Sequence, residues 1–253
     1  MKTLPLLLAA CLAAASAGEL TGRQVMEKVR SHNNPHDELT ELEMRLVDDA
    51  GRSRTRKLRI EYLRTDEGLD RTLIRFSYPR RMKGTGLLTH EQKGRNDDQW
   101  LYLPSLRRTR RIAADAKTER FVQSDFTYED LQPEDLEDNA YKLLRSETVD
   151  GRPCHVVEAV PRSPGGYSRR EIAVDAERWL PLRILYFDEG GRHVKTEHAT
   201  EVRQHEGRFW RPDRVEMADL EREHTTVFLI QRRVIDGGID PQHFTLRFLA
   251  TGR

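Results

Sequence analysis

Apolar residues occupy every second position over several stretches in the first half of the chain. The clearest stretches are residues 40–46, 57–62 and 73–78, and glycine-containing turn signals at 49–51 and 66–68 separate them. Strict alternation between short turns is typical of antiparallel strands with one buried face. The pattern therefore predicts an antiparallel meander.

The second half of the chain repeats this pattern between further glycine turns. We expect strands at residues 140–148, 153–161, 168–175, 181–188, 193–204, 208–219 and 224–235. With those of the first half they make about a dozen strands, and so many twisted antiparallel strands curl rather than stay flat. Because continuous Val/Ile/Leu strands are absent from the sequence, a doubly covered parallel sheet is excluded. The fold class is mainly β, an open curved antiparallel sheet.

Three short segments carry helix signals instead of strand signals. Residues 21–30 begin at a possible Thr21 cap and place Val25, Met26 and Val29 on one face. Residues 124–131 follow Ser124 as a second potential cap, and residues 240–249 begin with Asp240-Pro241. We expect these pieces to cover the sheet. No low-complexity linker divides the sequence, so residues 18–253 are predicted to form one domain.

The first seventeen residues have the composition of a secretory signal peptide. Lys2 precedes an apolar run, and Ala15-Ser16-Ala17 provides a small-x-small cleavage site. Two alternatives are a transmembrane anchor, for which the run is too short, and a lipoprotein signal cleaved at Cys11, which leaves a short apolar region. We predict cleavage after Ala17 and a periplasmic protein. Cleavage leaves Cys154 as the single cysteine, interpreted as a small buried residue.

Composition and charge narrow the class of partner. The chain is 37% apolar and 34% charged, with 43 basic and 42 acidic side chains. A nucleic-acid-binding protein needs a large positive excess, so the balance argues against nucleic acid. Disorder combines low hydrophobicity with a large net charge, and this chain is nearly neutral. We therefore expect a folded monomer with little apolar material to spare.

The sequence contains no recognisable motif for catalysis or metal binding. Nine histidines are scattered without HExxH or paired Cys/His spacing, and GxSxG is absent from the sequence. Gly84-Thr85-Gly86 lacks the Lys-Ser/Thr pair of a phosphate loop, which favours a tight bend before a strand. We therefore expect a protein that is not an enzyme and binds no metal or cofactor. An envelope hydrolase is kept as a minor alternative.

Four arginines crowd one short stretch, at positions 107, 108, 110 and 111. Arginine grips phosphates and carboxylates with two parallel hydrogen bonds, so one interpretation is an anion-binding patch. The other is a solvated strand whose charge is balanced by the acidic cluster at residues 125–138, which the matching charges favour.

A half-open sheet with movable helices over its dry face suits an extended apolar ligand. The alternating apolar residues are the candidates for lining such a cavity, and each of them is as well explained by an ordinary closed core. They are Leu42, Met44, Leu58, Ile60, Tyr62, Ile74, Phe76, Trp100 and Tyr102.

An ordered set of motifs between residues 84 and 131 resembles the LolA-like outer-membrane lipoprotein-sorting family, in particular its uncharacterised branch that accompanies RND-type exporters. The motifs are Gly84-Thr85-Gly86-Leu87-Leu88-Thr89-His90-Glu91, Asp98–Arg108, Arg110-Arg111-Ile112 and Ser124–Leu131. We take their residues as structural or docking candidates, namely Gly84, Thr85, Gly86, Glu91, Asp98, Arg107, Arg108, Arg110, Arg111, Ser124, Asp125, Phe126, Tyr128, Glu129 and Asp130.

The resemblance implies a half-barrel of about eleven antiparallel strands with a helical lid. It also implies a role in carrying the acyl chains of lipids or lipoproteins across the periplasm. The leading hypothesis is thus a non-enzymatic periplasmic carrier between the inner and outer membranes. The alternative is an interaction module that docks on an RND-type inner-membrane exporter through the arginine stretch and the acidic cluster.

Overall fold

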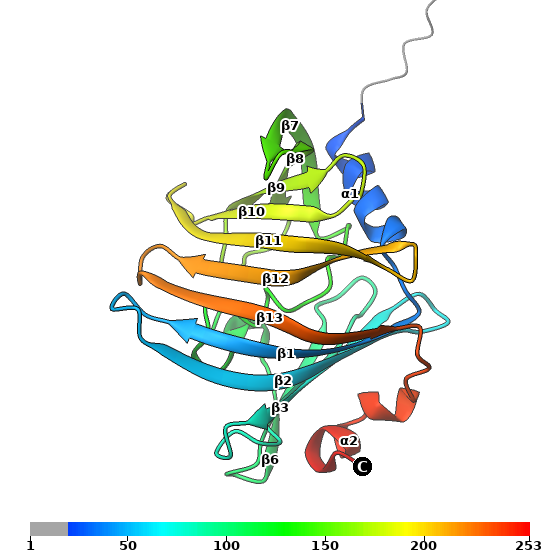
Figure 1. The fold of residues 1–253 in the computed structure, drawn as a ribbon, viewed down its shortest axis with the longest axis vertical. Helices are drawn as coiled ribbons and strands as arrows, with labels where there is room; N and C mark the ends of the chain where they lie inside the picture. Colours follow the sequence, from blue (N-terminus) through cyan, green and yellow to red (C-terminus); the bar gives the residue numbers. More distant parts are fainter. Residues whose placement is uncertain (1–19) are drawn as a thin grey trace, which may run out of the picture.

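The structure is a computed structural model, and it describes residues 20–253. Thirteen strands, two α-helices and three 3₁₀ turns follow one another along the chain (Figure 1). Their order is α1 Gly22–His32, β1 Asp37–Val47, β2 Ser53–Arg64, β3 Asp70–Tyr78, β4 Gly86–His90, β5 Asp98–Leu103, β6 Arg108–Arg111, η1 Ala114–Ala116, η2 Phe121–Gln123, β7 Asn139–Val149, β8 Arg152–Pro161, β9 Arg169–Asp175, β10 Pro181–Phe187, β11 His193–His205, β12 Phe209–Asp219, β13 His224–Ile235, η3 Pro241–Phe244 and α2 Leu246–Thr251.

All thirteen strands belong to one open sheet in the order β6-β5-β4-β3-β2-β1-β13-β12-β11-β10-β9-β8-β7. Every neighbouring pair is antiparallel, which confirms the predicted mainly β antiparallel fold. The sheet has thirteen strands where the family resemblance implied about eleven. The first and last strands pair with each other in the middle, so the two meander halves share one sheet.

The edge strands β6 and β7 follow each other in sequence although they lie at opposite edges of the sheet. The chain between them, residues 112–138, must therefore pass across the sheet, and we call it the crossing segment. Figure 1 shows the outer strands curving away behind the central ones, with this segment on that same side. The crossing segment thus occupies the concave face, where the alternating pattern of the sequence predicts a ligand.

Apolar packing joins the crossing segment to the first half of the sheet. Phe121 and Tyr128 are buried in one cluster with Met44 and Phe76, and the Phe76 and Phe121 rings lie 5.8 Å apart. A buried side chain of this size contributes roughly 1.5–3 kcal/mol relative to an exposed one. This core is closed by the chain itself.

The C-terminal residues cover the opposite face of β3–β5. Phe244 of η3 and Leu249 of α2 are buried against Leu73 and Leu88. The expected short element at residues 240–249 is thereby confirmed, with Asp240 accepting a hydrogen bond from the Gln242 amide.

The N-terminal helix α1 packs on β7 and β8, where Val25 and Met26 are buried. Thr21 caps it in a capping box with Gln24, as the sequence indicated. Gly22 is needed at this contact because a Cβ there would lie 2.6 Å from the backbone carbonyl carbon of Lys142. The helix is thus held close to one edge of the sheet.

The helix expected at residues 124–131 is wrong. A 3₁₀ turn, Phe121–Gln123, directly precedes these residues, and its Val122 and Gln123 have positive φ angles of 43° and 65°. The Ser124 hydroxyl donates to the Phe121 and Phe126 carbonyls instead of capping a helix. Local side-chain to backbone bonds of this kind compete with helix formation.

The predicted signal peptide, residues 1–17 with its cleavage site after Ala17, lies outside the described residues. Within residues 20–253, none of the helices combines the length and apolar character needed to cross a membrane. Cys154 is buried in the apolar packing of β8, as expected.

Candidate functional site

The crossing segment is fixed to the centre of the sheet by the carboxylate of Asp125, which is 0% exposed. One carboxylate oxygen contacts the Thr226 hydroxyl and the His224 ring Nδ1, each at 2.6 Å, and the other lies 3.1 Å from Arg222. The Asp125 amide donates to Thr226 Oγ1 at 3.0 Å. A buried carboxylate is tolerated only when it is paired and hydrogen-bonded in this way.

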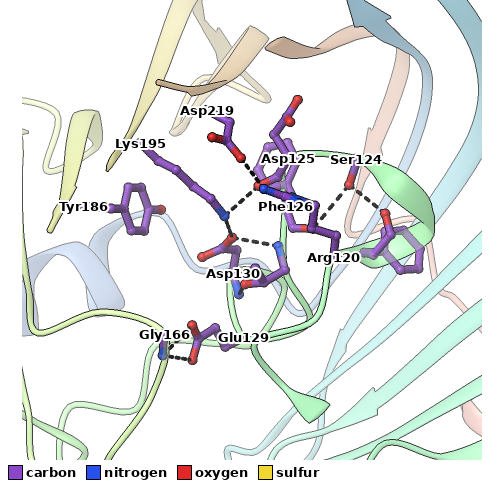
Figure 2. Close-up of polar contacts among 12 residues, drawn as sticks. Arg120, Ser124, Asp125, Phe126, Glu129, Asp130, Gly166, Tyr186, Lys195 and Asp219 are labelled. Carbon is purple, nitrogen blue, oxygen red and sulfur yellow. Dashed lines mark hydrogen bonds and ion pairs between the residues drawn. The ribbon is translucent and has the colours of Figure 1, made fainter. Parts of the chain in front are cut away.

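Lys195 of β11 adds a second anchor beside Asp125 (Figure 2). Its Nζ donates to the Asp125 carbonyl at 2.8 Å and to the Tyr167 hydroxyl at 2.8 Å, and it lies 3.4 Å from Asp130. Asp130 also accepts from the Thr127 amide at 2.7 Å. One buried ammonium group therefore joins both ends of the Asp125–Asp130 stretch to the sheet.

Outer contacts of the same stretch reach a loop and a neighbouring strand end (Figure 2). Glu129 accepts from the Gly166 amide at 3.0 Å, and a side chain at Gly166 would collide with that carboxylate. Burial raises the pKa of Glu129 above its ordinary value. Arg120 pairs with Asp219 at 2.7 Å. The crossing segment is thus held along both sides of Asp125.

The other half of the sheet also holds the crossing segment through side chains that donate to its backbone. Arg56 of β2 donates to the Val122 carbonyl at 2.6 Å. Gln99 of β5 donates to the Tyr128 carbonyl at 3.0 Å. Strands from both meander halves therefore satisfy buried backbone acceptors of one segment, as buried polar groups require.

A cavity of about 460 Å³ remains between α1, strands β1–β3 and the end of the crossing segment. We call it the α1 cavity. Its apolar lining comes from α1, β2 and the crossing segment, namely Met26, Val29, Pro35, Ile60, Leu131, Pro133 and Leu136. Ligand sites of small molecules have volumes of roughly 300–1,000 Å³ and are mostly apolar, so this cavity is large enough for a ligand chain.

Charged residues of the α1 cavity are paired with one another or with nearby residues. Arg64 binds Asp70 at 2.9 Å, and Arg211 binds Glu38 at 2.8 Å. The Tyr62 hydroxyl donates to Asp70 at 2.8 Å. Because each of these charges already has a partner, these residues leave no unpaired charge in the cavity that would attract a charged ligand.

A second cavity of about 310 Å³ lies on the other side of Pro133 and Glu134, and Met26 and Val29 line it as well. Glu197 of β11 contributes to its wall and accepts a hydrogen bond from the Tyr186 hydroxyl at 3.1 Å. Burial raises the pKa of Glu197 to about 7, and the negative charge of Asp130 adds to the shift. This wall therefore gains a negative charge as the pH passes neutrality.

Among residues 20–253, no group of three or more His, Cys, Asp or Glu side chains is placed to hold a metal ion.

Comparison with solved structures places this fold among LolA-like proteins. A domain from Vibrio parahaemolyticus provisionally assigned to outer membrane lipoprotein sorting is 27% identical and has a TM-score of 0.87, covering 90% of this chain and 98% of its own. A DUF1329 family protein from Desulfovibrio piger is 26% identical with a TM-score of 0.85, covering 90% and 97%. A LolA superfamily protein from Nitrosomonas europaea has the same fold, at 18% identity, a TM-score of 0.71 and coverage of 90% and 99%.

A family model described as an uncharacterized protein matches residues 68–251, well over half of the chain. The chain belongs to this LolA-like family. The resemblance of its sequence motifs to that family is thereby confirmed. No curated protein matches the sequence.

The structure separates the nine proposed cavity residues into three groups. Ile60 and Tyr62 line the α1 cavity. Trp100 and Tyr102 lie on the opposite face, packed on the cluster of Phe244, because successive strand residues point to opposite faces. The remaining five are buried beneath the crossing segment, namely Leu42, Met44, Leu58, Ile74 and Phe76. Their role as ligand contacts stays a prediction.

The motif residues of the LolA-like family divide between the crossing segment and the first half of the sheet. Ser124, Asp125, Phe126, Tyr128, Glu129 and Asp130 are part of the segment itself, in the stretch already described. Glu91 is buried and accepts from the Asp70 amide at 2.6 Å and from Arg30. Gly84 has the positive φ of 86° that a tight bend before β4 requires, and Thr85 and Gly86 follow it into the strand.

The expected balance between the arginine stretch and the acidic cluster is wrong. Arg110 pairs with Glu119 and Arg111 with Asp98, while Arg107 and Arg108 form no ion pair within residues 20–253. The acids of residues 125–138 pair instead with α1 and with the second half of the sheet, through Arg23, Arg170, Lys195 and Arg222. The arginine stretch and the acidic cluster carry charges of similar number and opposite sign, but this match did not mean that the two groups are in contact.

The partners of Asp125 were missed because they lie far away in the sequence. Thr226 and His224 occupy buried positions of β13, and Lys195 a buried position of β11. A polar residue at an apolar position of an alternating strand is the signal that was available for them.

We expect Asp125→Ala to loosen the crossing segment, because it leaves His224, Thr226 and Arg222 without their shared acceptor. The loss of a paired buried charge costs about 3–5 kcal/mol of unfolding free energy. Hydrogen exchange of residues 112–138 and urea unfolding measure both effects. The matched control is Asp115→Ala, an exposed residue of the same segment. Unchanged exchange in the Asp125 variant contradicts the anchoring role.

Glu197 makes stability depend on pH in a defined direction. Its pKa is about 7 in the folded protein and about 4.5 when unperturbed, so the folded state holds the proton more tightly and loses stability as pH rises between these values. Glu197→Gln removes that loss. The variant is expected to exceed the parent by about 3 kcal/mol near pH 8 and to match it below about pH 4.5.

Thermal unfolding across this pH range measures the difference, with exposed Glu206→Gln as the control. A constant difference between the Glu197 variant and its parent at all pH values contradicts the shifted titration.

Proposed function

We propose that this protein is a non-enzymatic periplasmic carrier that shelters the apolar part of a lipid or lipoprotein between the inner and outer membranes. LolA-like relatives support a lipid- or lipoprotein-binding role, because a similar domain of 27% identity is assigned to lipoprotein sorting. The predicted signal peptide supports export to the periplasm. The ligand class is therefore an acyl chain.

The observation that carries the proposal is the α1 cavity. Its apolar lining from α1, β2 and the crossing segment surrounds about 460 Å³ of space, while its charged residues neutralise one another. Burying each methylene group contributes about 0.8 kcal/mol, so a chain of several methylenes binds without any covalent step. An acyl chain fits this chemistry better than a charged metabolite, which would find no unpaired counter-charge.

The five cavity candidates beneath the crossing segment extend the proposal to longer ligands. Leu42, Leu58 and Phe76 are buried in one cluster with Phe121 and Tyr128, so movement of these two rings would expose them on the concave face. Release of the Asp125 anchor would open that path, so the segment serves as an internal lid in place of the helical lid expected from the resemblance. Ile60 and Tyr62 contact the ligand without any such movement.

The alternative role, docking on an RND-type exporter through the arginine stretch and the acidic cluster, lacks this support. The two groups were expected to form one surface. Arg107 and Arg108 are exposed near the sheet edge, whereas Asp125 is fully buried and Glu129 and Asp130 line the second cavity.

Filling the α1 cavity tests the carrier role. Ile60→Phe adds a ring where the ligand chain is expected, so the affinity for a fluorescent fatty acid should fall by about tenfold or more, because lost burial of two or three methylenes has that effect. Native mass spectrometry of protein taken from the periplasm should show added lipid mass on the parent and less on the variant.

The control is Val160→Phe, which places the same ring at a position that is 39% exposed on β8. Absence of lipid from the parent protein, together with no binding of the fatty acid, contradicts the proposal. Equal affinities of the Ile60 variant and the parent contradict the assignment of the cavity.

A further inference from the structure

The nearly neutral charge of the chain conceals a segregated distribution. Residues 50–60, 71–90 and 99–114 contain no Asp or Glu at all. They contain fourteen basic residues, namely Arg52, Arg54, Arg56, Lys57, Arg59, Arg71, Arg75, Arg80, Arg81, Lys83, Arg107, Arg108, Arg110 and Arg111. These three stretches form much of β2–β6, which are neighbours in the sheet. One half of the sheet is therefore strongly basic.

The antiparallel order brings the start of the first stretch and the turns in the middle of the other two to one end of the sheet. Lys57, near the start of β2, pairs with Tyr78 at the end of β3. The β3–β4 turn touches the β5–β6 turn, since a Cβ at Gly84 would lie 3.3 Å from Cγ of Pro104. Burial, together with the positive charges of Arg54 and Arg81, lowers the pKa of Arg56 to about 10. The cations of separate stretches are therefore close enough to repel one another electrostatically.

Seven exposed cations at this end lack acidic partners among residues 20–253. We call this group the basic tip, and its members are Arg54, Lys57, Arg80, Arg81, Lys83, Arg107 and Arg108. The neighbouring Arg52, by contrast, is paired with Asp48, and Arg110 and Arg111 have partners. Most arginines elsewhere in the chain are paired, so the free charge is concentrated at one place.

Two large apolar side chains are exposed among these cations. Leu106, in the β5–β6 turn directly before Arg107, is 66% exposed. Tyr78, two residues before Arg80, is 52% exposed. An aromatic ring with a polar end is typical of a membrane–water interface, and a leucine between cations can enter the layer below the headgroups.

We propose that the basic tip is a docking surface for the anionic headgroups of a phospholipid bilayer, with Leu106 and Tyr78 entering the interface. Cationic residues near an anionic leaflet each add to the attraction, and exposed apolar residues add a contribution that does not depend on charge. An acidic soluble protein would be recognised by the cations alone and would leave Leu106 exposed. The combination of cations with exposed apolar side chains in these turns therefore favours a bilayer over an acidic protein as the partner.

The proposed docking is separate from ligand binding. The α1 cavity is lined by Arg64 and Asp70, at the far ends of β2 and β3 from Lys57 and Tyr78. The basic tip therefore contacts the membrane while the cavity at the other end of these strands stays accessible. Loss of docking and loss of fatty-acid binding are thus distinguishable outcomes.

Co-sedimentation with vesicles tests the proposal. The protein should bind vesicles of phosphatidylcholine containing phosphatidylglycerol, bind pure phosphatidylcholine weakly, and lose binding as salt rises. The double variant Arg107→Glu/Arg108→Glu should weaken binding to the anionic vesicles by about tenfold or more. Leu106→Ser should weaken it by about fivefold without changing its salt dependence.

The matched control is Lys93→Glu/Lys142→Glu, which makes the same change in net charge at exposed, unpaired positions of the described chain away from the basic tip. All variants share residues 1–19, so any contribution of that region cancels. Equal loss in this control, or binding that ignores phosphatidylglycerol, overturns the proposal. Full binding by Leu106→Ser, or capture of an acidic protein by the arginines with no vesicle binding, also overturns it.

Discussion

The fold depends on a buried carboxylate at the centre of a curved sheet. The strand order puts β6 and β7 at opposite edges, so the connection between them has to cross the concave face. A connection buried there would leave its polar backbone groups without water. Asp125 and Lys195 resolve this problem, since together they satisfy buried polar groups of the crossing segment and attach it to β11 and β13. Apolar packing of Phe121 and Tyr128 then closes one half of the face.

This arrangement explains why so little apolar material is sufficient. The crossing segment supplies the second layer for the first half of the sheet, and η3 with α2 covers the opposite side of β3–β5. A cavity also remains beside α1, where Met26, Val29 and Ile60 meet without filling the volume. The polar network around Asp125 and the α1 cavity are linked through the crossing segment. Asp125 anchors this segment to the sheet, and the end of the segment forms one wall of the cavity.

Much of the fold could be predicted from the sequence because alternation is a local property. The strands of the second half lie within a few residues of their expected bounds, and both terminal short elements were recognised. Residues 124–131 of the crossing segment were mistaken for a helix, because Ser124 and the apolar residues after it follow a helical pattern. Ser124 instead bonds to the nearby Phe121 carbonyl, and Asp125 bonds to Thr226 of the distant strand β13. The candidate site was only partly foreseen. Alternation identified Ile60 and Tyr62 as residues of the dry face, but it could not indicate that the chain itself covers Met44 and Phe76.

The concave face is divided into a core closed by the crossing segment and a cavity beside α1, which we propose accepts an acyl chain. A crystal structure of the protein bound to a fatty acid tests it most directly. We expect electron density for the chain between Met26, Ile60 and Leu131, with Asp125 still bonded to Thr226. Density for the chain on the opposite face, near Trp100 and Phe244, would contradict it.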